Sequence, residues 1–289
     1  MKTWMKVLLG IIAVPLVVIL LAVIWVKVSV AQHLDKTYEI KTEQLASEIK
    51  GDAKLGEHIV RVRNGCVDCH GVDLAGGKVM DNGAMGKVYG PNLTPASLKD
   101  WSDTQILRAI RHGVGKEGKA LVIMPSQDYQ YLHEQDLAHI LAFLRSLPPV
   151  EKAKVPVQLG PIASVLLASG KAPLLPAEII DHNKEIPPVV KEEVSIEFGQ
   201  YLANTACIGC HRPSLKGGKI EVGPPDWPAA SDITQAALGK WTEADFIKTM
   251  KSGVNPSGTQ IRPPMPIHLI SQYSDTELKS LWMYLQTVK

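Results

Sequence analysis

Hydrophobic residues follow three patterns along the chain: one continuous run near the N-terminus and two regions of helical periodicity. The run extends from Val7 to Val26 and is interrupted only by Gly10 and Pro15. At a rise of about 1.5 Å per residue, a helix of this length spans about 30 Å, the thickness of the hydrocarbon core of a bilayer. We therefore expect a transmembrane anchor within residues 1–30, followed by a polar stalk at residues 31–50.

A cleaved signal peptide is the alternative interpretation of this run. Ser29-Val30-Ala31 has the small residues of a cleavage site. The apolar region of a signal peptide is usually only ~7–15 residues long, however, and the longer run here favours an uncleaved anchor. Lys2 and Lys6 precede the run. Because positive charge tends to stay in the cytoplasm, we expect everything beyond residue 30 to be exported.

Each half of the chain contains three stretches in which apolar residues recur at helical spacing. Ser102, Thr242 and Ser274 stand at the N-cap positions of three of them. The first half ends at Leu147-Pro148-Pro149, where proline stops a helix. No stretch alternates convincingly between apolar and polar residues, so we predict an all-α fold. The supporting apolar positions are Leu55, Ile59 and Val62, then Ile106, Leu107 and Ile110 in the first half, and Ile196, Tyr201 and Leu202, then Phe246, Ile247 and Met250 in the second.

An internal repeat relates the two halves. Two copies of about 100 residues indicate a duplicated domain rather than a solenoid. Most repeated positions are offset by 141 residues, and the tryptophans by 140. The repeated elements are Cys66-Val67-Asp68-Cys69-His70 with Cys207-Ile208-Gly209-Cys210-His211, Met124-Pro125 with Met265-Pro266, and Trp101 with Trp241.

The repeat defines the domain organisation. We place the first domain at residues 51–150 and the second at residues 191–289. Residues 151–190 join them and contain six prolines together with many aliphatic residues. Such a segment is too apolar for a free solvated linker, so we expect it to lie across both domains.

The two cysteine motifs carry the most specific chemical signal in the sequence. C-x-x-C-H is the attachment signal for a c-type haem, in which two thiols bond to the haem and the histidine binds its iron. Zinc would require four ligands in one site, and a thioredoxin-like pair would require a βαβ context. Two disulfides would give the histidines no reason to recur. We therefore predict two covalently attached haem c groups, bound by Cys66, Cys69 and His70 and by Cys207, Cys210 and His211.

A second iron ligand is expected from methionine. Methionine opposite histidine is the ligation of electron-transfer cytochromes c. Met124 and Met265 form the only methionine pair related by the repeat, and each precedes a proline before the last helix of its half. Met80 and Met85 are alternatives for the first haem only. A methionine is more often core filler, but the paired Met-Pro context favours ligation.

The repeated tryptophans have two open interpretations. Trp101 and Trp241 stand just before the second helix of each half. Either indole N–H could donate a hydrogen bond to a haem propionate, which would make both residues part of the cofactor sites. Packing beside the helix start explains the same positions equally well, because a large aromatic side chain contributes strongly to a core.

These motifs together resemble a known family. The chain is similar to membrane-anchored dihaem cytochromes c with two class I cytochrome c domains, and to cytochrome subunits of bacterial membrane-bound dehydrogenases. The strings that carry the resemblance are Gly90-Pro91-Asn92-Leu93-Thr94, Trp101-Ser102-Asp103, Arg111-His112-Gly113-Val114, Met124-Pro125 and Leu144-Arg145-Ser146-Leu147-Pro148-Pro149. In class I domains, a proline carbonyl accepts a hydrogen bond from the ligand histidine. The resemblance assigns that role to Pro91 in the first domain and to Pro224 in the second.

The class I fold also implies how each domain is closed. Its first and last helices cross at a small residue, which lets the two backbones approach and leaves room for an aromatic ring. We expect Gly56 to lie against Phe143 in the first domain and Gly199 against Tyr284 in the second.

The net charge and the expected iron ligands reduce the number of functions that the chain could have. Beyond residue 27, acidic residues outnumber basic ones by one, so a nucleic-acid partner is not expected. Two haems with both axial positions filled suit an electron carrier more than an enzyme. We expect a single-pass protein of a bacterial inner membrane, with periplasmic haem domains that relay electrons between a dehydrogenase or quinol-oxidising complex and a terminal oxidase. A dihaem peroxidase or a thiosulfate-oxidising cytochrome is the alternative.

Overall fold

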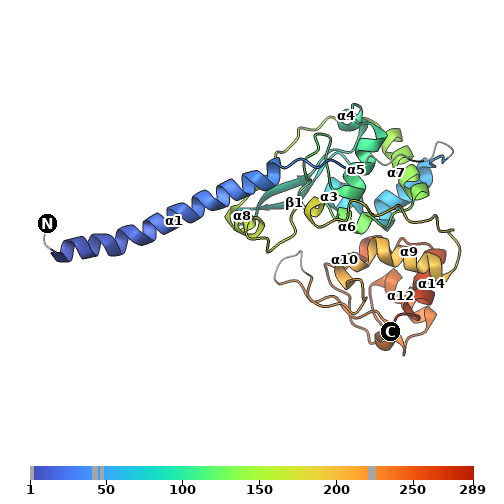
Figure 1. Ribbon diagram of the computed structural model, residues 1–289. Coiled ribbons are helices and arrows are strands. Elements are labelled where there is room, and N and C mark those ends of the chain that lie inside the picture. The colour runs from blue at the N-terminus through green and yellow to red at the C-terminus, as the bar shows by residue number, and fades with distance from the viewer. Residues whose placement is uncertain (1–2, 41–44, 46–48, 221–225) are drawn as a thin grey trace.

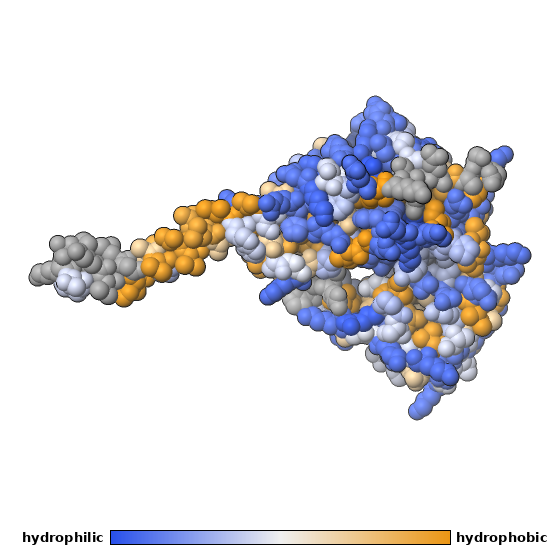
Figure 2. Space-filling model, in the orientation of Figure 1, coloured by the Kyte–Doolittle hydropathy of each residue, from blue (hydrophilic) through white to orange (hydrophobic). Residues whose placement is uncertain are grey.

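The computed structural model describes residues 3–40, 45, 49–220 and 226–289. A long helix, α1 (Thr3–Asp35), projects from a body made of two lobes (Figure 1). Its exposed side chains are largely apolar, and Figure 2 shows this apolar surface following the helix to the body. By length and composition, Ile11–Asp35 is sufficient to cross a membrane. Because α1 ends at Asp35, the first residues of the predicted stalk are helical.

The first lobe is built from short helices around a buried aliphatic core. Leu74, Leu107 and Leu137 are almost completely buried within it. The helices are α2 (Ala53–His58), its π-helical continuation η1 (Ile59–Arg63), α3 (Cys66–His70), α4 (Pro95–Leu98), α5 (Asp103–His112), α6 (Ser126–Tyr129) and α7 (Glu134–Ser146).

The second lobe repeats this arrangement. Its helices are α9 (Ile196–Ala206), α10 (Ile208–His211), α11 (Gln235–Leu238), α12 (Glu243–Ser252), α13 (Ile267–Ile270) and α14 (Asp275–Leu285). Ser102, Thr242 and Ser274 each form a capping box with the third residue of the following helix. The helix starts predicted at these three residues are therefore confirmed.

Each lobe is closed by its first and last helices, which cross at glycine. A Cβ on Gly56 would overlap the carbonyl of His139 and lie 2.8 Å from the Cβ of Phe143. A Cβ on Gly199 would overlap the carbonyl of Ser280 and lie 2.8 Å from the Cβ of Tyr284. The two predicted crossings are confirmed, and only glycine allows backbones to approach this closely.

The fold is mostly helical, as predicted, but the described residues also form a small sheet, so the prediction of an all-α fold is confirmed only in part. Three strands form an antiparallel sheet in the order β1 (Gly77–Asn82), β2 (Gly86–Gly90) and β3 (Gln158–Leu159). The register of β1 on β2 shifts between Lys78 and Met80, and β1 has no regular alternation of burial. A short, irregular surface strand leaves little periodicity in the sequence, which explains why the pattern of residues did not reveal it.

The segment between the lobes is packed rather than free. It contains β3, α8 (Pro161–Ala168) and the 3₁₀ turn η2 (Pro176–Glu178). Four buried linker residues form a separate small core that also takes in Val30 and Leu34 of α1. These four residues are Ala163, Leu167, Leu174 and Leu175. The linker therefore fastens the end of α1 to the first lobe.

We predict that Gly199→Ala destabilises the second lobe. The added methyl group would push α9 and α14 apart at the Ser280 carbonyl, and overpacking of this kind costs about 1–3 kcal/mol. Gly83→Ala is the matched control, because a Cβ there meets no atom within 4 Å. Urea denaturation of the holoprotein should show a lower midpoint for Gly199→Ala alone. Equal midpoints for the two variants would contradict the crossing.

Candidate haem-binding sites

The first cysteine motif occupies one short helix. Gly65, with φ +57°, starts α3 in the left-handed region, and Cys66, Cys69 and His70 follow on its turns. The Nδ1 atom of His70 lies 2.8 Å from the carbonyl oxygen of Pro91. Because a carbonyl can only accept, this bond places the ring proton on Nδ1 and leaves the Nε2 lone pair available to a metal. Burial lowers the pKa of His70, which favours the neutral, metal-binding form.

The second motif has the same arrangement with a different acceptor. His211 donates from Nδ1 to the carbonyl oxygen of Ser231 at 2.8 Å, and burial lowers its pKa as well. Pro224, to which the resemblance assigned this bond, lies outside the described residues, and Ser231 takes the role. Ser231 follows its histidine by 20 residues and Pro91 by 21. The near-equal spacing was the signal that could have identified Ser231, since a backbone carbonyl accepts whatever its side chain.

The loops after the two motifs share their backbone conformation. Leu74 and Leu215 both have positive φ, at 56° and 57°, although neither is glycine. The carbonyl of Leu74 accepts a bond from the Leu93 N–H, and that of Leu215 from the Ile233 N–H. The same strained turn therefore positions the carbonyl acceptor opposite each ligand histidine.

The two methionines also occupy equivalent turns. The carbonyl of Met124 accepts a bond from the Ser126 N–H at 2.8 Å, and that of Met265 from the Ile267 N–H at 2.9 Å. The intervening prolines have φ and ψ of −79° and 53° after Met124 and −83° and 63° after Met265. Both methionines are half-buried. This repetition of backbone geometry extends the sequence repeat to the residues predicted as second ligands.

The donor set fits haem c at both sites. Burial raises the pKa of Cys66 and of Cys207 to about 12, so both sulfur atoms lie in apolar surroundings that suit an apolar macrocycle. Trp101 and Trp241 are half-buried and pack against the core at the starts of α5 and α12. Their bond to a propionate remains a prediction.

Both motif helices contact the opposite lobe. The carboxylate of Asp68 in α3 lies 3.0 Å from Nε2 of His268 in the second lobe. In the other direction, Gly209 of α10 is so close to Asp128 that a Cβ would lie 2.5 Å from its carboxylate. Around these contacts, α13 packs on η1 and α6 packs on α9. The motif-bearing sides of the two lobes therefore face each other across one interface.

A buried arginine occupies this interface. The guanidinium of Arg63 lies 3.1 Å from the carboxylate of Asp136, 2.9 Å from Glu277 and 2.9 Å from Glu192. The Tyr201 hydroxyl donates to Asp136 at 2.6 Å. Asp136 and Glu277 are offset by 141 residues and follow the N-caps of α7 and α14 by three. One arginine thus forms ion pairs with equivalent carboxylates of both lobes.

The hydrogen bonds just before the motifs complete this contact. The Asn64 amide donates to the carbonyl of Thr205 at 3.2 Å, and the Tyr273 hydroxyl donates to the carbonyl of Arg63 at 2.8 Å. Asn64 and Thr205 are themselves repeat partners, each two residues before the first cysteine of its motif. The Asn64 side chain, just before one motif, is therefore bonded to the backbone that enters the other.

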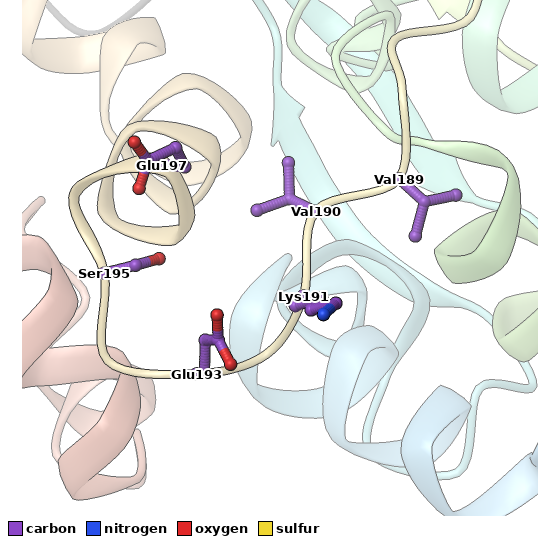
Figure 3. A pocket seen from close by; sticks show the side chains of 6 residues that line it. All are labelled: Val189, Val190, Lys191, Glu193, Ser195 and Glu197. Atoms are coloured by element: carbon purple, nitrogen blue, oxygen red, sulfur yellow. The ribbon is translucent and has the colours of Figure 1, made fainter.

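A surface hollow lies beside the interface rather than at a motif. Figure 3 shows it between the linker and the start of α9. Its lining residues are Val189, Val190, Lys191, Glu193, Ser195 and Glu197, none of which belongs to a cysteine motif or a Met-Pro turn. The candidate site is therefore the pair of motif loops and not this hollow.

Comparison with known proteins supports the same interpretation. The family model for cytochrome c matches residues 53–148 and 196–289. Over 283 residues the chain is 27% identical to a protein named diheme cytochrome c-type from Cereibacter sphaeroides, with 87% of this chain and 91% of that protein covered.

Two further relatives are subunits of dehydrogenases. The gluconate 2-dehydrogenase cytochrome c subunit of Pantoea cypripedii is 26% identical over 281 residues, and the match covers 84% of this chain and 62% of the relative. The fructose dehydrogenase cytochrome subunit of Gluconobacter japonicus is 24% identical over 257 residues, covering 80% and 51%. The chain thus spans less than two thirds of the length of either dehydrogenase subunit.

We predict that acid weakens the interface through Glu277. Burial alone would raise the pKa of Glu277, but the hydrogen bond from His58 and the charge of Arg63 outweigh it and hold this pKa at about 2. The ordinary value is 4.5. The carboxylate therefore stabilises the fold above pH 4.5, and that stability is lost as the pH falls towards 2.

The test compares Glu277→Gln with wild type in urea denaturation between pH 5 and pH 2. The variant should be less stable at pH 5, by about 3 kcal/mol at most, and its stability should fall less with acid. Glu197→Gln, on an exposed side chain of α9, is the control and should follow wild type. Parallel curves for Glu277→Gln and wild type would show that the Arg63 network contributes nothing to this pH dependence.

Proposed function

This chain belongs to the cytochrome c family, and on that premise we propose that it relays single electrons through two His/Met-ligated haems at the outer face of a bacterial inner membrane. It is a dihaem cytochrome c that carries two covalently attached haem c groups and transfers electrons. The ligation, the location and the redox partners are the parts that we propose here.

The proposed iron ligands are supported by one observation that recurs in both lobes. Each lobe contains a histidine whose Nδ1 is bound to a loop carbonyl and, 54 residues later, a methionine in a Met-Pro turn of the same backbone geometry. We assign His70 and Met124 to the first iron and His211 and Met265 to the second. Bound haem c supplies an iron that takes up and releases one electron, and methionine ligation raises its reduction potential.

The surrounding bonds suit fast electron transfer. Backbone hydrogen bonds hold the Met124 and Met265 turns, and carbonyl acceptors hold the rings of His70 and His211. Ligands fixed in this way would keep their positions in both oxidation states, so little reorganisation would accompany each transfer. A dihaem peroxidase or a thiosulfate-oxidising cytochrome would instead need an iron position that substrate can reach, and the paired methionines leave none.

The partners follow from the relatives and from the membrane helix. Because two relatives are cytochrome subunits of dehydrogenases, a dehydrogenase is the proposed electron donor, with a quinol-oxidising complex as the other source. A terminal oxidase is the proposed acceptor. Lys2 and Lys6 precede the apolar run in the sequence and favour a cytoplasmic N-terminus, which would put both lobes in the periplasm.

The ligation is tested by removing each methionine. Met124→Ala and Met265→Ala should each lose one near-infrared thioether-to-iron charge-transfer band, lower one of the two reduction potentials, and bind carbon monoxide at one haem per chain. Reduced wild type should bind no carbon monoxide, because both irons are six-coordinate.

Met80→Ala and Met283→Ala are the matched controls, one methionine in each half of the chain outside the Met-Pro turns. Both should keep the two charge-transfer bands and exclude carbon monoxide. Stoichiometric binding of carbon monoxide by one haem of the wild-type protein would identify an open iron and favour the enzyme over the relay.

A further inference from the structure

Helix α8 presents an apolar face that is left open by the part of the chain that the structure describes. Its eight residues, Pro161–Ala168, include no charged side chain. One face is packed, with Ala163 and Leu167 at 0% and 2% exposure, and the other is open, with Ile162 and Val165 at 51% and 50%. A polar face would be expected at such exposed helical positions in a segment surrounded by water.

The position of α8 indicates what covers this face. Figure 1 shows α8 at the edge of the body from which α1 projects. The packed face of α8 shares a core with Val30 and Leu34 of α1. If the apolar run of α1 ends at Val26, these two residues lie about 6 Å and 12 Å beyond the hydrocarbon core. The headgroup layer is about 5–8 Å deep, so α8 lies at or just above the depth of the lipid headgroups.

The attachment of α8 to the first lobe is rigid. The Gly160 N–H donates to the carbonyl of Met85 at 2.9 Å, and the Ile162 N–H donates to the carbonyl of Ala84 at 2.9 Å. Leu159, just before the helix, pairs with Gly86 in the sheet. Any contact that orients α8 would therefore also orient the sheet and the lobe that carries it.

The same small core reaches the predicted ligand loop. The Ile123 N–H donates to the carbonyl of Leu174 at 2.8 Å, and both residues pack in the core shared by α8 and α1. Met124 follows directly in the chain. The depth and orientation of α8 at the bilayer therefore influence the distance between the first iron site and the membrane surface.

We propose that α8 is a second membrane contact, whose Ile162–Val165 face enters the lipid headgroup layer beside α1 and fixes the orientation of the first lobe. An apolar helix face in the membrane plane is typical of interfacial helices, which sink about 5–10 Å into the boundary between headgroups and acyl chains. This inference rests on the proposed anchor, because α1 brings α8 to the bilayer. A partner subunit is the competing occupant of the face.

The test measures lipid protection of single cysteines in the full-length holoprotein. The chain is placed in nanodiscs of phosphatidylethanolamine and phosphatidylglycerol in equal amounts, without any other protein. The four motif thiols are bound to haem, so an introduced cysteine is the reactive thiol that a charged, membrane-impermeant maleimide can modify. Val165→Cys reports on α8, Val18→Cys on the middle of α1, and Val194→Cys is the matched control at 47% exposure.

We expect modification of Val165→Cys and Val18→Cys to be slowed at least several-fold in nanodiscs, relative to the urea-denatured chain. Val194→Cys should show no such protection. If Val18→Cys is protected while Val165→Cys reacts like Val194→Cys, the membrane anchor is supported and the proposed membrane contact of α8 is wrong. A partner subunit would then be the occupant of the apolar face of α8. If Val18→Cys is itself unprotected, α1 does not span the membrane. The proposed membrane contact of α8, which depends on that anchor, is then also wrong.

Discussion

A buried guanidinium joins the last helices of the two lobes of this protein. Arg63 is 4% exposed, and its charge is shared by Asp136, at the start of the last helix of one lobe, and Glu277, at the same place in the other. Removing the guanidinium would leave these buried carboxylates without a countercharge, and a loss of this kind costs about 3–5 kcal/mol. The relative placement of the lobes, and with it that of the haem sites, depends on this interaction.

The consequence for electron transfer follows from where Arg63 lies. It ends the helix that leads into the first cysteine motif, and the adjoining Asn64 is bonded to Thr205 just before the second. Side-chain hydrogen bonds therefore join the segment before each motif to the opposite lobe. If electrons pass between the haems along this route, each outside partner needs only a weak, small docking surface.

The sequence indicated the chemistry of the motifs and, through the class I resemblance, the helix crossings at Gly56 and Gly199, but not the contacts between the lobes. The cysteine motifs and the Met-Pro pair repeat in register, which made them visible in the sequence. The buried position of Arg63 could not be predicted in this way. A positively charged residue on a helix is usually exposed to solvent, and only the structure shows which carboxylates surround it. The strands were missed because their irregular pairing leaves no alternation, and Ser231 because a carbonyl acceptor has no side-chain signature.

If the Arg63 interface is the route of electron transfer, the two haems exchange electrons within one chain. Flash photoreduction of the fully oxidised protein, followed as the electron redistributes between the haems, tests this most directly. We expect an exchange rate that is independent of protein concentration in wild type and slower in Arg63→Met. A rate proportional to protein concentration would mean that electrons pass only between molecules, and the Arg63 interface would then not be the route.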